Sequence, residues 1–530
     1  MYNTPIGYQI IVLHAHLPYI RHKGYNPPFL EENWLKEAIL ETYLPLIKSF
    51  RILKKEGVNF KITMSFTPPL VTMLRDSYLQ ENFLKYLDKL LELSQKEIQR
   101  TGNEPHLQYL AKTYQKNFEE LKAMYMELDR DIISGFQEFV NSGNLEVVGS
   151  CASHAYLPIL DTEPSSLKAQ IRVGRREFRN TWGKDPRGFW LPECGYFQGL
   201  NHFLADEGIR YFFVDTHGIT HATPRPKYGA YAPVEIGRGV FSFGRDPSSS
   251  FQVWSSTEGY PSDYRYREYY RDIGHELPEE YISNYIHPTG TRHNTGIKYH
   301  RITGRTDYKE YYNPELAMQA AGEHAEDFLR SRIAQSEMFL QTEGQAPIIV
   351  SPYDAELFGH WWYEGPKFLE FLFKKIHFDQ HKIQTIHPMQ ALGILPRVQS
   401  VDMNMSSWGE SGYSDVWLNS SNEWIYRHTI ECSHLMHESA STFKGTVNPL
   451  ERRVLNQMAR ELLLLQSSDW AFIIKAGTTV KYAEKRVKIH TNLFLDLKGM
   501  LDSGNIQESR LKEIEDEHSI FPDVKFEDFL

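Results

Sequence analysis

Residues 8–16 read YQIIVLHAH, a near-continuous apolar run that ends in two histidines. Such a run is typical of a parallel strand buried on both faces, because helices cover both sides of a parallel sheet. The segment ENWLKEAILETYLPLIKSFRILKKEG (32–57) follows, and its apolar residues recur with helical spacing. A buried strand followed by a helix predicts the first unit of an α/β core.

Further runs of the same kind recur along the chain, and helical patterns such as SLKAQIRVGRREFRNTWG (166–183) lie between several of them. Repeated strand–helix units predict a barrel-like or doubly wound parallel sheet. The runs are FKITMSF (60–66), LEVVGS (145–150), GFWLPE (188–193), RYFFVDT (210–216), APIIVSPYDAE (346–356) and KIQTIHP (382–388).

Two segments interrupt this repeat within a catalytic region predicted to span 1–400. Residues of about 76–140 are charged and amphipathic, which predicts a helical insertion. Residues of about 222–312 are rich in Gly, Pro, Tyr, Arg and Ser, and a loop region of that length is usually functional. Residues 401–530 are predicted to form an α-helical C-terminal domain that contributes aromatic side chains to a cleft.

The composition of the chain argues against some classes of function. The formal net charge of −10 over 530 residues argues against a nucleic-acid partner, which needs a concentrated basic face. The three cysteines lie far apart, the N-terminus has no leader pattern, and no apolar run is long enough to span a bilayer. We therefore expect a cytoplasmic protein without a membrane partner. Tyr, Phe and Trp make up 13% of the chain, a hint of saccharide clefts, although aromatic residues mostly fill cores.

Polar residues follow several of the predicted strands. In a parallel barrel these strand ends meet on the face that holds the active site. Glu193 lies between Trp190 and Tyr196, and Asp354 precedes a second cluster of aromatic residues. A pair of carboxyl groups about 5 Å apart cleaves glycosidic bonds with retention. A single carboxylate at a strand end is more often a cap or an ion-pair partner, but two in aromatic surroundings favour this chemistry.

The same segments resemble, in order, the five signature regions of glycoside hydrolase family 57. They are HAHLPYI (14–20), NLEVVGSCASHAYLP (144–158), GFWLPECGYF (188–197), PYDAELFGHWWYEGP (352–366) and SSWGESGYSDVWLN (406–419). The resemblance implies a distorted, incomplete (β/α)7 barrel with a helical insertion and an all-α C-terminal domain. It also implies that Glu193 is the nucleophile, that Asp354 is the acid/base, and that His14 and His16 line a donor-sugar subsite without metal.

Other residues are predicted to support substrate binding. The predicted sugar-binding set comprises Glu146, His154, Trp190, Tyr196, Asp215, His217, Trp254, His360, Trp361, Trp362, Trp408 and Trp417. Core packing is the alternative for each tryptophan. His360 is also a candidate to orient Asp354. Alternate histidines at a strand end suit zinc as well, so a metal site is the alternative for His14 and His16. We expect neither a metal nor a cofactor.

The segments 223–274 and 295–304 are similar to the subgroup of the family that branches 1,4-α-glucans. That subgroup closes a loop tyrosine over the site to exclude water. Here Glu235 stands where an aromatic residue is expected, and Tyr228 and Tyr231 are the nearest substitutes. The sequence therefore predicts branching of an α-1,4-glucan with appreciable hydrolysis, in a monomer or small homo-oligomer. The alternatives are an α-amylase, a 4-α-glucanotransferase, a metal-dependent hydrolase or deacetylase, and a non-catalytic glucan-binding protein.

Overall fold

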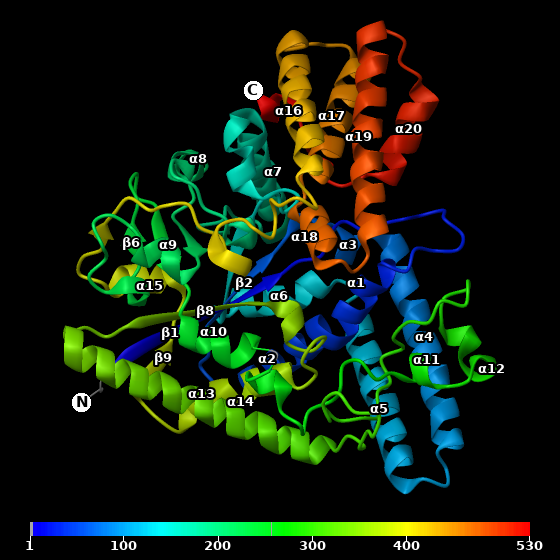
Figure 1. Ribbon diagram of the computed structural model, residues 1–530, viewed down its shortest axis with the longest axis vertical. Coiled ribbons are helices and arrows are strands. Elements are labelled where there is room, and N and C mark those ends of the chain that lie inside the picture. Colours follow the sequence, from blue (N-terminus) through cyan, green and yellow to red (C-terminus); the bar gives the residue numbers. More distant parts are fainter. Residues whose placement is uncertain (1–3, 256) are drawn as a thin grey trace.

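Seven parallel strands in one twisted sheet form the core of the part of the protein that the structure describes. Figure 1 shows how its elements are arranged. The structure is a computed structural model and describes residues 4–255 and 257–530. The strands lie in the order β7, β5, β4, β3, β2, β1, β8. Their bounds are β1 Gly7–Ala15, β2 Ile62–Phe66, β3 Leu145–Ser150, β4 Gly188–Trp190, β5 Tyr211–Val214, β7 Phe241–Gly244 and β8 Ile348–Asp354.

The sheet curls into a barrel that does not close with a strand ladder among the described residues. The gap lies between β7 and β8, where the backbone N–H of Asp246 donates to the carbonyl oxygen of Val350 at 2.8 Å. Short strands extend the edges: β9 (Ile383–Thr385) pairs with the start of β1, while β6 (Val234–Glu235) and β10 (Gln399–Ser400) continue beyond β7. The predicted incomplete barrel of seven strands is confirmed.

Helices pack along the sheet, and the near-continuous apolar residues of its strands are buried. Ile10–Leu13 in β1 are at most 1% exposed. The segment predicted as one helix over 32–57 forms α1 (Glu32–Ala38), a π-helical turn η1 (Ile39–Tyr43) and α2 (Leu44–Lys55). The other helices beside the sheet are α3 (Pro68–Arg75), α7 (Pro164–Trp182), α8 (Leu200–Asp206), α9 (Thr216–Thr220), α13 (Pro314–Glu343), α14 (Gly365–Phe378) and α15 (Pro388–Ile394).

The predicted helical insertion is a hairpin of α4 (Ser77–Arg100) and α5 (Pro105–Glu127), followed by α6 (Ile132–Asn141). Asp76 begins α4 by accepting a hydrogen bond from the backbone N–H of Leu79 at 3.0 Å, a standard helix N-cap. The region of about 222–312 differs from a plain loop. It contains β6, β7, α10 (Pro247–Trp254), α11 (Ile273–Glu276) and α12 (Glu279–Ile282). β7 reads FSFG, in which Ser242 interrupts the apolar residues, so no near-continuous apolar run marks it in the sequence.

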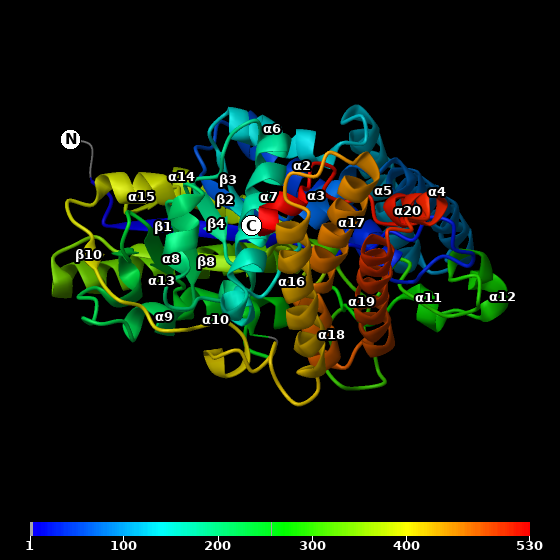
Figure 2. The same cartoon turned by 90° about the horizontal axis from the view of Figure 1, so that it is seen from above.

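The C-terminal helices form a bundle that stands on the barrel (Figure 1). From above, the bundle lies between the β10 end of the sheet and the α4–α5 hairpin (Figure 2). Residues 401–423 contain no α-helix, so the bundle begins later than predicted. Within the described residues, no helix combines the length and apolar character that crossing a membrane requires. The helices are α16 (Trp424–Thr442), α17 (Pro449–Leu465), α18 (Ser468–Ala476), α19 (Val480–Ser503) and α20 (Glu508–Glu517).

Candidate active site

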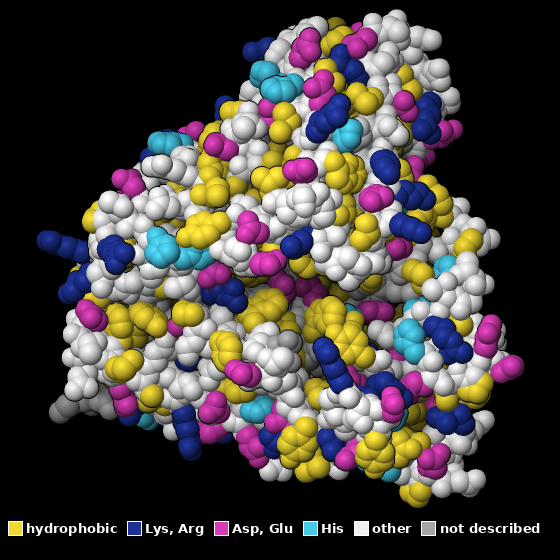
Figure 3. Space-filling view, in the orientation of Figure 1, with side chains coloured by type: hydrophobic (Ala, Val, Ile, Leu, Met, Phe, Trp, Pro, Cys, Tyr) yellow, Lys and Arg dark blue, Asp and Glu magenta, His cyan; other side chains and the backbone are white. Residues whose placement is uncertain are grey.

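The carboxyl ends of β1, β2 and β8 bring the first candidate residues together. In the sheet register, His14 of β1 lies opposite Ser65 of β2 on one side and Asp354 of β8 on the other. The short strand β4 ends two residues before the turn that carries Glu193. Since all these strands are parallel, their ends share one face of the barrel. A hollow opens near the middle of the molecule, with acidic side chains in it and hydrophobic side chains along its border (Figure 3).

Glu193 lies on a strained turn and is held by two hydrogen bonds. Its φ of 61° is in the left-handed region, which non-glycine residues rarely adopt and which often marks a functional position. The indole N–H of Trp408 donates to Oε2 at 2.8 Å, and the hydroxyl of Ser468 donates to Oε1 at 2.8 Å. The carboxylate is therefore fixed from two sides, by residues that follow the barrel in the chain.

Three histidines are stacked beside this carboxylate. The ring of His154 lies 4.9 Å from that of His14 and 3.8 Å from that of His16. Nε2 of His14 is 2.9 Å from Nε2 of His154, whose Nδ1 lies 2.9 Å from the hydroxyl of Ser468. A chain of hydrogen bonds thus runs from His14 through His154 and Ser468 to Glu193. Burial lowers the pKa of His14 and His154 well below the usual range, which keeps both rings neutral.

The environment of His16 shifts its pKa in the opposite direction from that of His14 and His154. Burial opposes its protonation, but Asp469 outweighs this and raises the pKa of His16. Nε2 of His16 lies 3.0 Å from both carboxylate oxygens of Asp469, and Nδ1 is 2.8 Å from the hydroxyl of Thr67. The first turn of α18 therefore supplies two site residues, Ser468 and Asp469.

Burial raises the pKa of both predicted catalytic carboxyl groups. Burial raises the pKa of Glu193 to about 7, while the hydrogen bonds from Trp408 and Ser468 limit the rise. Burial also raises the pKa of Asp354 well above its usual range, and the negative charges of Glu356 and Glu193 add to the effect. The negative charge of an ionised Glu193 thus favours retention of the proton by Asp354. One group is suited to act as an acid and the other as a nucleophile.

Glu356 is a third carboxylate at the site, and sequence reasoning missed it. One of its oxygens accepts hydrogen bonds from the Tyr43 hydroxyl and, at 3.2 Å, from the backbone N–H of His16.

Arg245, which sequence reasoning also missed, supplies a positive charge at the site. Its guanidinium lies 3.3 Å from Asp215 and 6.0 Å from the ring centroids of Trp254 and Trp408, and it lowers the pKa of Asp354.

Aromatic residues predicted to bind sugar divide into two groups. Trp408 contacts Glu193 directly, and partly buried Trp254 lies with its ring 6.1 Å from that of Trp408. Trp361 is half exposed. Sugar stacking stays a prediction for these three. The others pack inside: Trp190 behind His14, Tyr196 on Phe212, Trp362 between Phe358 and Phe368, and Trp417 on Tyr156.

The structure corrects several of the predicted positions. Glu146 begins β3 rather than ending it, and it accepts a hydrogen bond from the Tyr211 hydroxyl at 2.7 Å. Because the strands are parallel, the start of β3 lies at the end of the barrel opposite the site. His360 does not orient Asp354; its Nδ1 lies 2.8 Å from a carboxylate oxygen of Glu41.

Asp215 and His217 support the fifth signature region. Asp215 begins α9 and pairs with Arg245. Nε2 of His217 lies 2.7 Å from the carbonyl oxygen of Gly412, and thereby fastens the segment that carries Trp408. The substitutes for the loop tyrosine lie elsewhere. Tyr228 and Tyr231 pack on Phe339 of α13, and Glu235 accepts hydrogen bonds from the backbone N–H groups of Gly237 and Gly239.

Two groups of side chains in the described part of the chain have a spacing that suits a metal ion. In the first, His16, His154 and Asp469, hydrogen bonds already engage the ring nitrogens of both histidines. The second, Glu461, His490 and His518, is fully buried in the helical bundle. There a single carboxylate bonds Nδ1 of both rings. Hydrogen bonding accounts for these contacts, and a site without metal stays a prediction.

Comparison with known proteins places these residues in context. A family model described as Glycosyl hydrolase family 57 matches residues 10–405, and one described as 1,4-alpha-glucan branching enzyme, C-terminal, matches residues 428–529. A 1,4-alpha-glucan branching enzyme of Thermococcus kodakarensis is 32% identical over 98% of this chain and 78% of its own length.

Solved structures agree with this placement over nearly the whole chain. The alpha-amylase AmyC from Thermotoga maritima has a TM-score of 0.93 and 44% identity, with 99% of both chains covered. The branching enzyme of glycoside hydrolase family 57 type from Pyrococcus horikoshii has a TM-score of 0.89 and 32% identity, with 99% of this chain and 97% of that chain covered.

Proposed function

Because this chain belongs to glycoside hydrolase family 57, we propose that it is a retaining enzyme that branches 1,4-α-glucans. It cleaves an α-1,4 linkage and transfers the released chain to a 6-hydroxyl of a glucan. The observation that carries this proposal is the pair of carboxyl groups, Glu193 and Asp354, in one buried polar site, where the charge of Glu193 favours the protonated form of Asp354.

The chemistry follows from these two groups. The carboxylate of Glu193 attacks the anomeric carbon, while Asp354 gives its proton to the departing glycosidic oxygen. A covalent glycosyl ester forms and the C–O bond to the leaving chain breaks. The ionised Asp354 then removes a proton from an acceptor hydroxyl, whose oxygen displaces Glu193. Two inversions at the anomeric carbon return the α configuration.

Hydrogen bonding prepares Glu193 for this attack. Trp408 and Ser468 each occupy one carboxylate oxygen, so the side chain has little rotational freedom. The ring nitrogens of neutral His14 and His154 are already engaged, by Ser65, by each other and by Ser468. These two rings therefore hold in place the Ser468 hydroxyl that donates to Glu193, and sugar contact at them stays a prediction.

Transfer to a sugar hydroxyl is supported by the C-terminal match to branching enzymes and by full-length relatives that carry that name. Hydrolysis is the second candidate, because the 44% identical structure is that of an alpha-amylase. The contacts of Tyr228 and Tyr231 with α13 also favour water entry, since both side chains lie against Phe339. We therefore propose branching accompanied by appreciable hydrolysis.

Incubation with amylose decides between these outcomes. New α-1,6 linkages are counted by proton NMR or by debranching, and new reducing ends are counted in the same samples. Branching forms an α-1,6 linkage for each α-1,4 linkage lost, with no net gain in reducing ends. Reducing ends without new branches would instead identify an α-amylase. The Glu193→Gln variant is the blank for both counts.

The proposed reaction also defines the binding partner of the protein. We infer an α-1,4-glucan such as amylose or glycogen as the partner. A cytoplasmic location and a monomer or small homo-oligomer stay predictions from the sequence.

A further inference from the structure

An exposed tryptophan, Trp361, lies on the loop that follows the acid/base strand and pairs with the partly buried Tyr269 of the 222–312 region. Trp361 is 52% exposed, and its ring stacks on that of Tyr269, with centroids 4.4 Å apart and planes 30° apart. We call these two residues the aromatic platform. Trp362, the next residue, is 1% exposed and packs in the core. The core therefore anchors the loop through Trp362 and leaves the larger part of the Trp361 indole facing outward.

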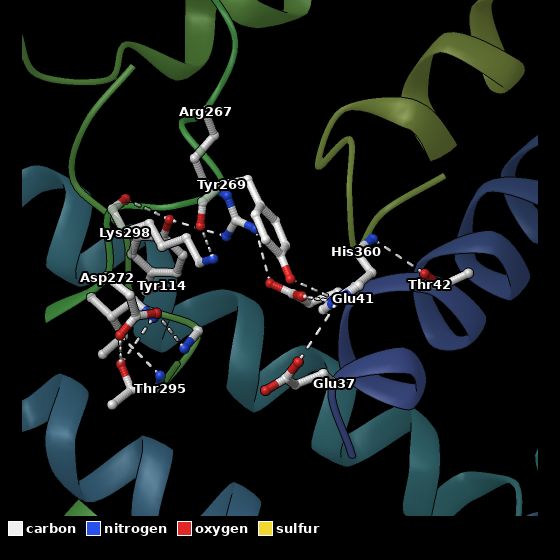
Figure 4. A network of polar contacts seen from close by, with 12 residues as sticks. Glu37, Glu41, Thr42, Tyr114, Arg267, Tyr269, Asp272, Thr295, Lys298 and His360 are labelled. Atoms are coloured by element: carbon white, nitrogen blue, oxygen red, sulfur yellow. Dashed lines mark hydrogen bonds and ion pairs between the residues drawn. The ribbon is translucent and has the colours of Figure 1, made fainter. Parts of the chain in front are cut away.

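A buried polar network holds Tyr269 in place (Figure 4). Its hydroxyl lies 3.2 Å from Nε2 of His360, whose Nδ1 is 2.8 Å from Glu41. Glu41 in turn pairs with Arg267 at 2.8 Å. The ammonium group of Lys298 lies 4.4 Å from the centroid of the Tyr269 ring. Tyr269, on which the Trp361 ring stacks, is thus held in place before any ligand arrives, which lowers the entropy cost of binding.

Glu37 lies beside this network with hydrogen-bonding capacity to spare (Figure 4). Among the described residues its carboxylate accepts no side-chain hydrogen bond, and its one ion-pair partner is His360, at 3.8 Å. Burial raises the pKa of Glu37 to about 7. Its side chain is nevertheless 13% exposed, so an outside donor reaches it. A carboxylic group beside an aromatic face is a pair of contacts suited to a sugar, whose C–H face is apolar and whose hydroxyl groups donate.

The helical segment α1–η1 and the loop after β8 together form one wall between the aromatic platform and the candidate active site. Tyr43 and Glu37 lie on the continuous helical segment α1–η1, and Tyr43 bonds Glu356 at the active site. Six residues of helix span roughly 9 Å. Trp361 also lies only a short loop beyond Asp354, and its backbone N–H donates to the carbonyl oxygen of Glu356 at 3.2 Å. A glucan chain bound at the catalytic carboxylates would thus continue along this wall.

We propose that the aromatic platform and Glu37 form a remote subsite for the α-1,4-glucan chain, away from the bond that is cut. The subsite rests on the proposed function, since it binds the same substrate. A ring of the chain stacks on Trp361, and one of its hydroxyl groups donates to Glu37. The site takes a neutral glucan chain and needs no ion.

Binding to an inactive enzyme tests the subsite apart from catalysis. In the Glu193→Gln background, titration calorimetry with maltoheptaose measures the dissociation constant. We expect Trp361→Ala to weaken binding roughly tenfold, Glu37→Gln to weaken it less, and Trp361→Phe to restore most of the affinity. Phe378→Ala is the matched control. Phe378 is 57% exposed at the end of α14, which leads to the start of β9 at the opposite end of the barrel.

The outcomes distinguish a failure of the proposed subsite from a failure of the proposed function. Equal affinity with and without the Trp361 ring, in a protein that binds maltoheptaose, would overturn the subsite and leave the function intact. Absence of maltoheptaose binding in the Glu193→Gln parent would count against both. In the active enzyme, the Trp361→Ala variant should raise KM for amylose about tenfold and change kcat little, because the ring is remote from the reacting atoms.

Discussion

The hydroxyl of Ser468 donates a hydrogen bond of 2.8 Å to the carboxylate of Glu193, across 275 residues of sequence. Ser468 begins α18 of the helical bundle, and its backbone N–H donates to the carbonyl oxygen of His154 at 3.0 Å. The bundle is thereby docked on the barrel at Glu193, the proposed nucleophile. The C-terminal domain consequently contributes a residue to the candidate active site.

Replacement of Ser468 by alanine should slow the reaction and shift its pH dependence. The lost hydrogen bond stabilised the ionised carboxylate, so the pKa of Glu193 rises and the acidic limb of the kcat/KM profile moves to higher pH. A hydrogen bond to a charged group contributes about 1.5–3 kcal/mol, so we expect roughly a ten- to hundredfold loss. Ser503→Ala, on the surface of the same bundle, is the control. An unchanged acidic limb would contradict the role of Ser468.

The roles of Glu193 and Asp354 are distinguishable with an activated substrate. We expect Glu193→Gln and Asp354→Asn to fold normally and to lose at least about a thousandfold in turnover of amylose. An aryl glycoside with a good leaving group needs no proton from the acid. Asp354→Asn should therefore form the glycosyl ester from it at a substantial rate, whereas Glu193→Gln should not. A burst of released phenol measures this step. Equal inactivity of both variants toward it would contradict the assignment.

Glu356 should set the alkaline limb of activity. Its negative charge is one cause of the raised pKa of Asp354, second only to burial. The neutral variant Glu356→Gln removes that charge, so the pKa of Asp354 falls and activity is lost at a lower pH than in the wild type. Full kcat/KM profiles between pH 5 and 10 would measure the shift. Movement of the limb to higher pH would show that Glu356 acts otherwise.

Much of the barrel was predictable because buried parallel strands leave apolar runs in the sequence. The run APIIVSPYDAE (346–356) predicted both β8 and the position of Asp354 at its end. It was harder to predict at which end of a strand a polar residue lies. Glu146 belongs to an equally good run, LEVVGS, but lies at its start, and thus at the wrong end of the barrel. β7 gave no signal because a serine interrupts its apolar residues, FSFG, whereas the equally short β5, YFFV, is apolar throughout.

Contacts across the domains were not predictable from local patterns. Ser468 and Asp469 stand in a short polar stretch between two helices, where a helix N-cap is the ordinary interpretation. Only the docking of α18 on the barrel turns them toward Glu193 and His16. For the tryptophans of the signature regions, the sequence marked the residues but did not show which of them are exposed. Trp361 and Trp362 are identical neighbours in sequence, yet one faces solvent and the other the core.

Acid should destabilise this protein through its buried histidines. Burial lowers the pKa of His22 and His490 from 6.5 to about 3, that of His387 to about 4, and those of His14 and His154 well below the usual range. Between these values and 6.5 the unfolded chain binds more protons than the folded protein. Their contribution to the free energy of unfolding is therefore complete above about pH 6.5 and declines as the pH falls.

Glu461 adds to the same trend at lower pH. It is buried, but the nearby His518 and His490 outweigh the effect of burial and hold the pKa of the Glu461 carboxyl below its ordinary value of 4.5. The stabilisation it provides is present above that value and is lost as the pH falls through the folded-state pKa. The raised pKa values of Glu37 and Glu193 act in the opposite direction, since these groups bind protons more readily in the folded protein. Calorimetric melting between pH 8 and pH 4 therefore isolates a histidine by difference: the Tm of His22→Asn should rise relative to that of the wild type as the pH falls below about 6.5. The exposed His381→Asn should keep a constant difference. A constant difference for His22→Asn from pH 6.5 to pH 5 would mean that this ring takes up its proton without cost to the folded chain.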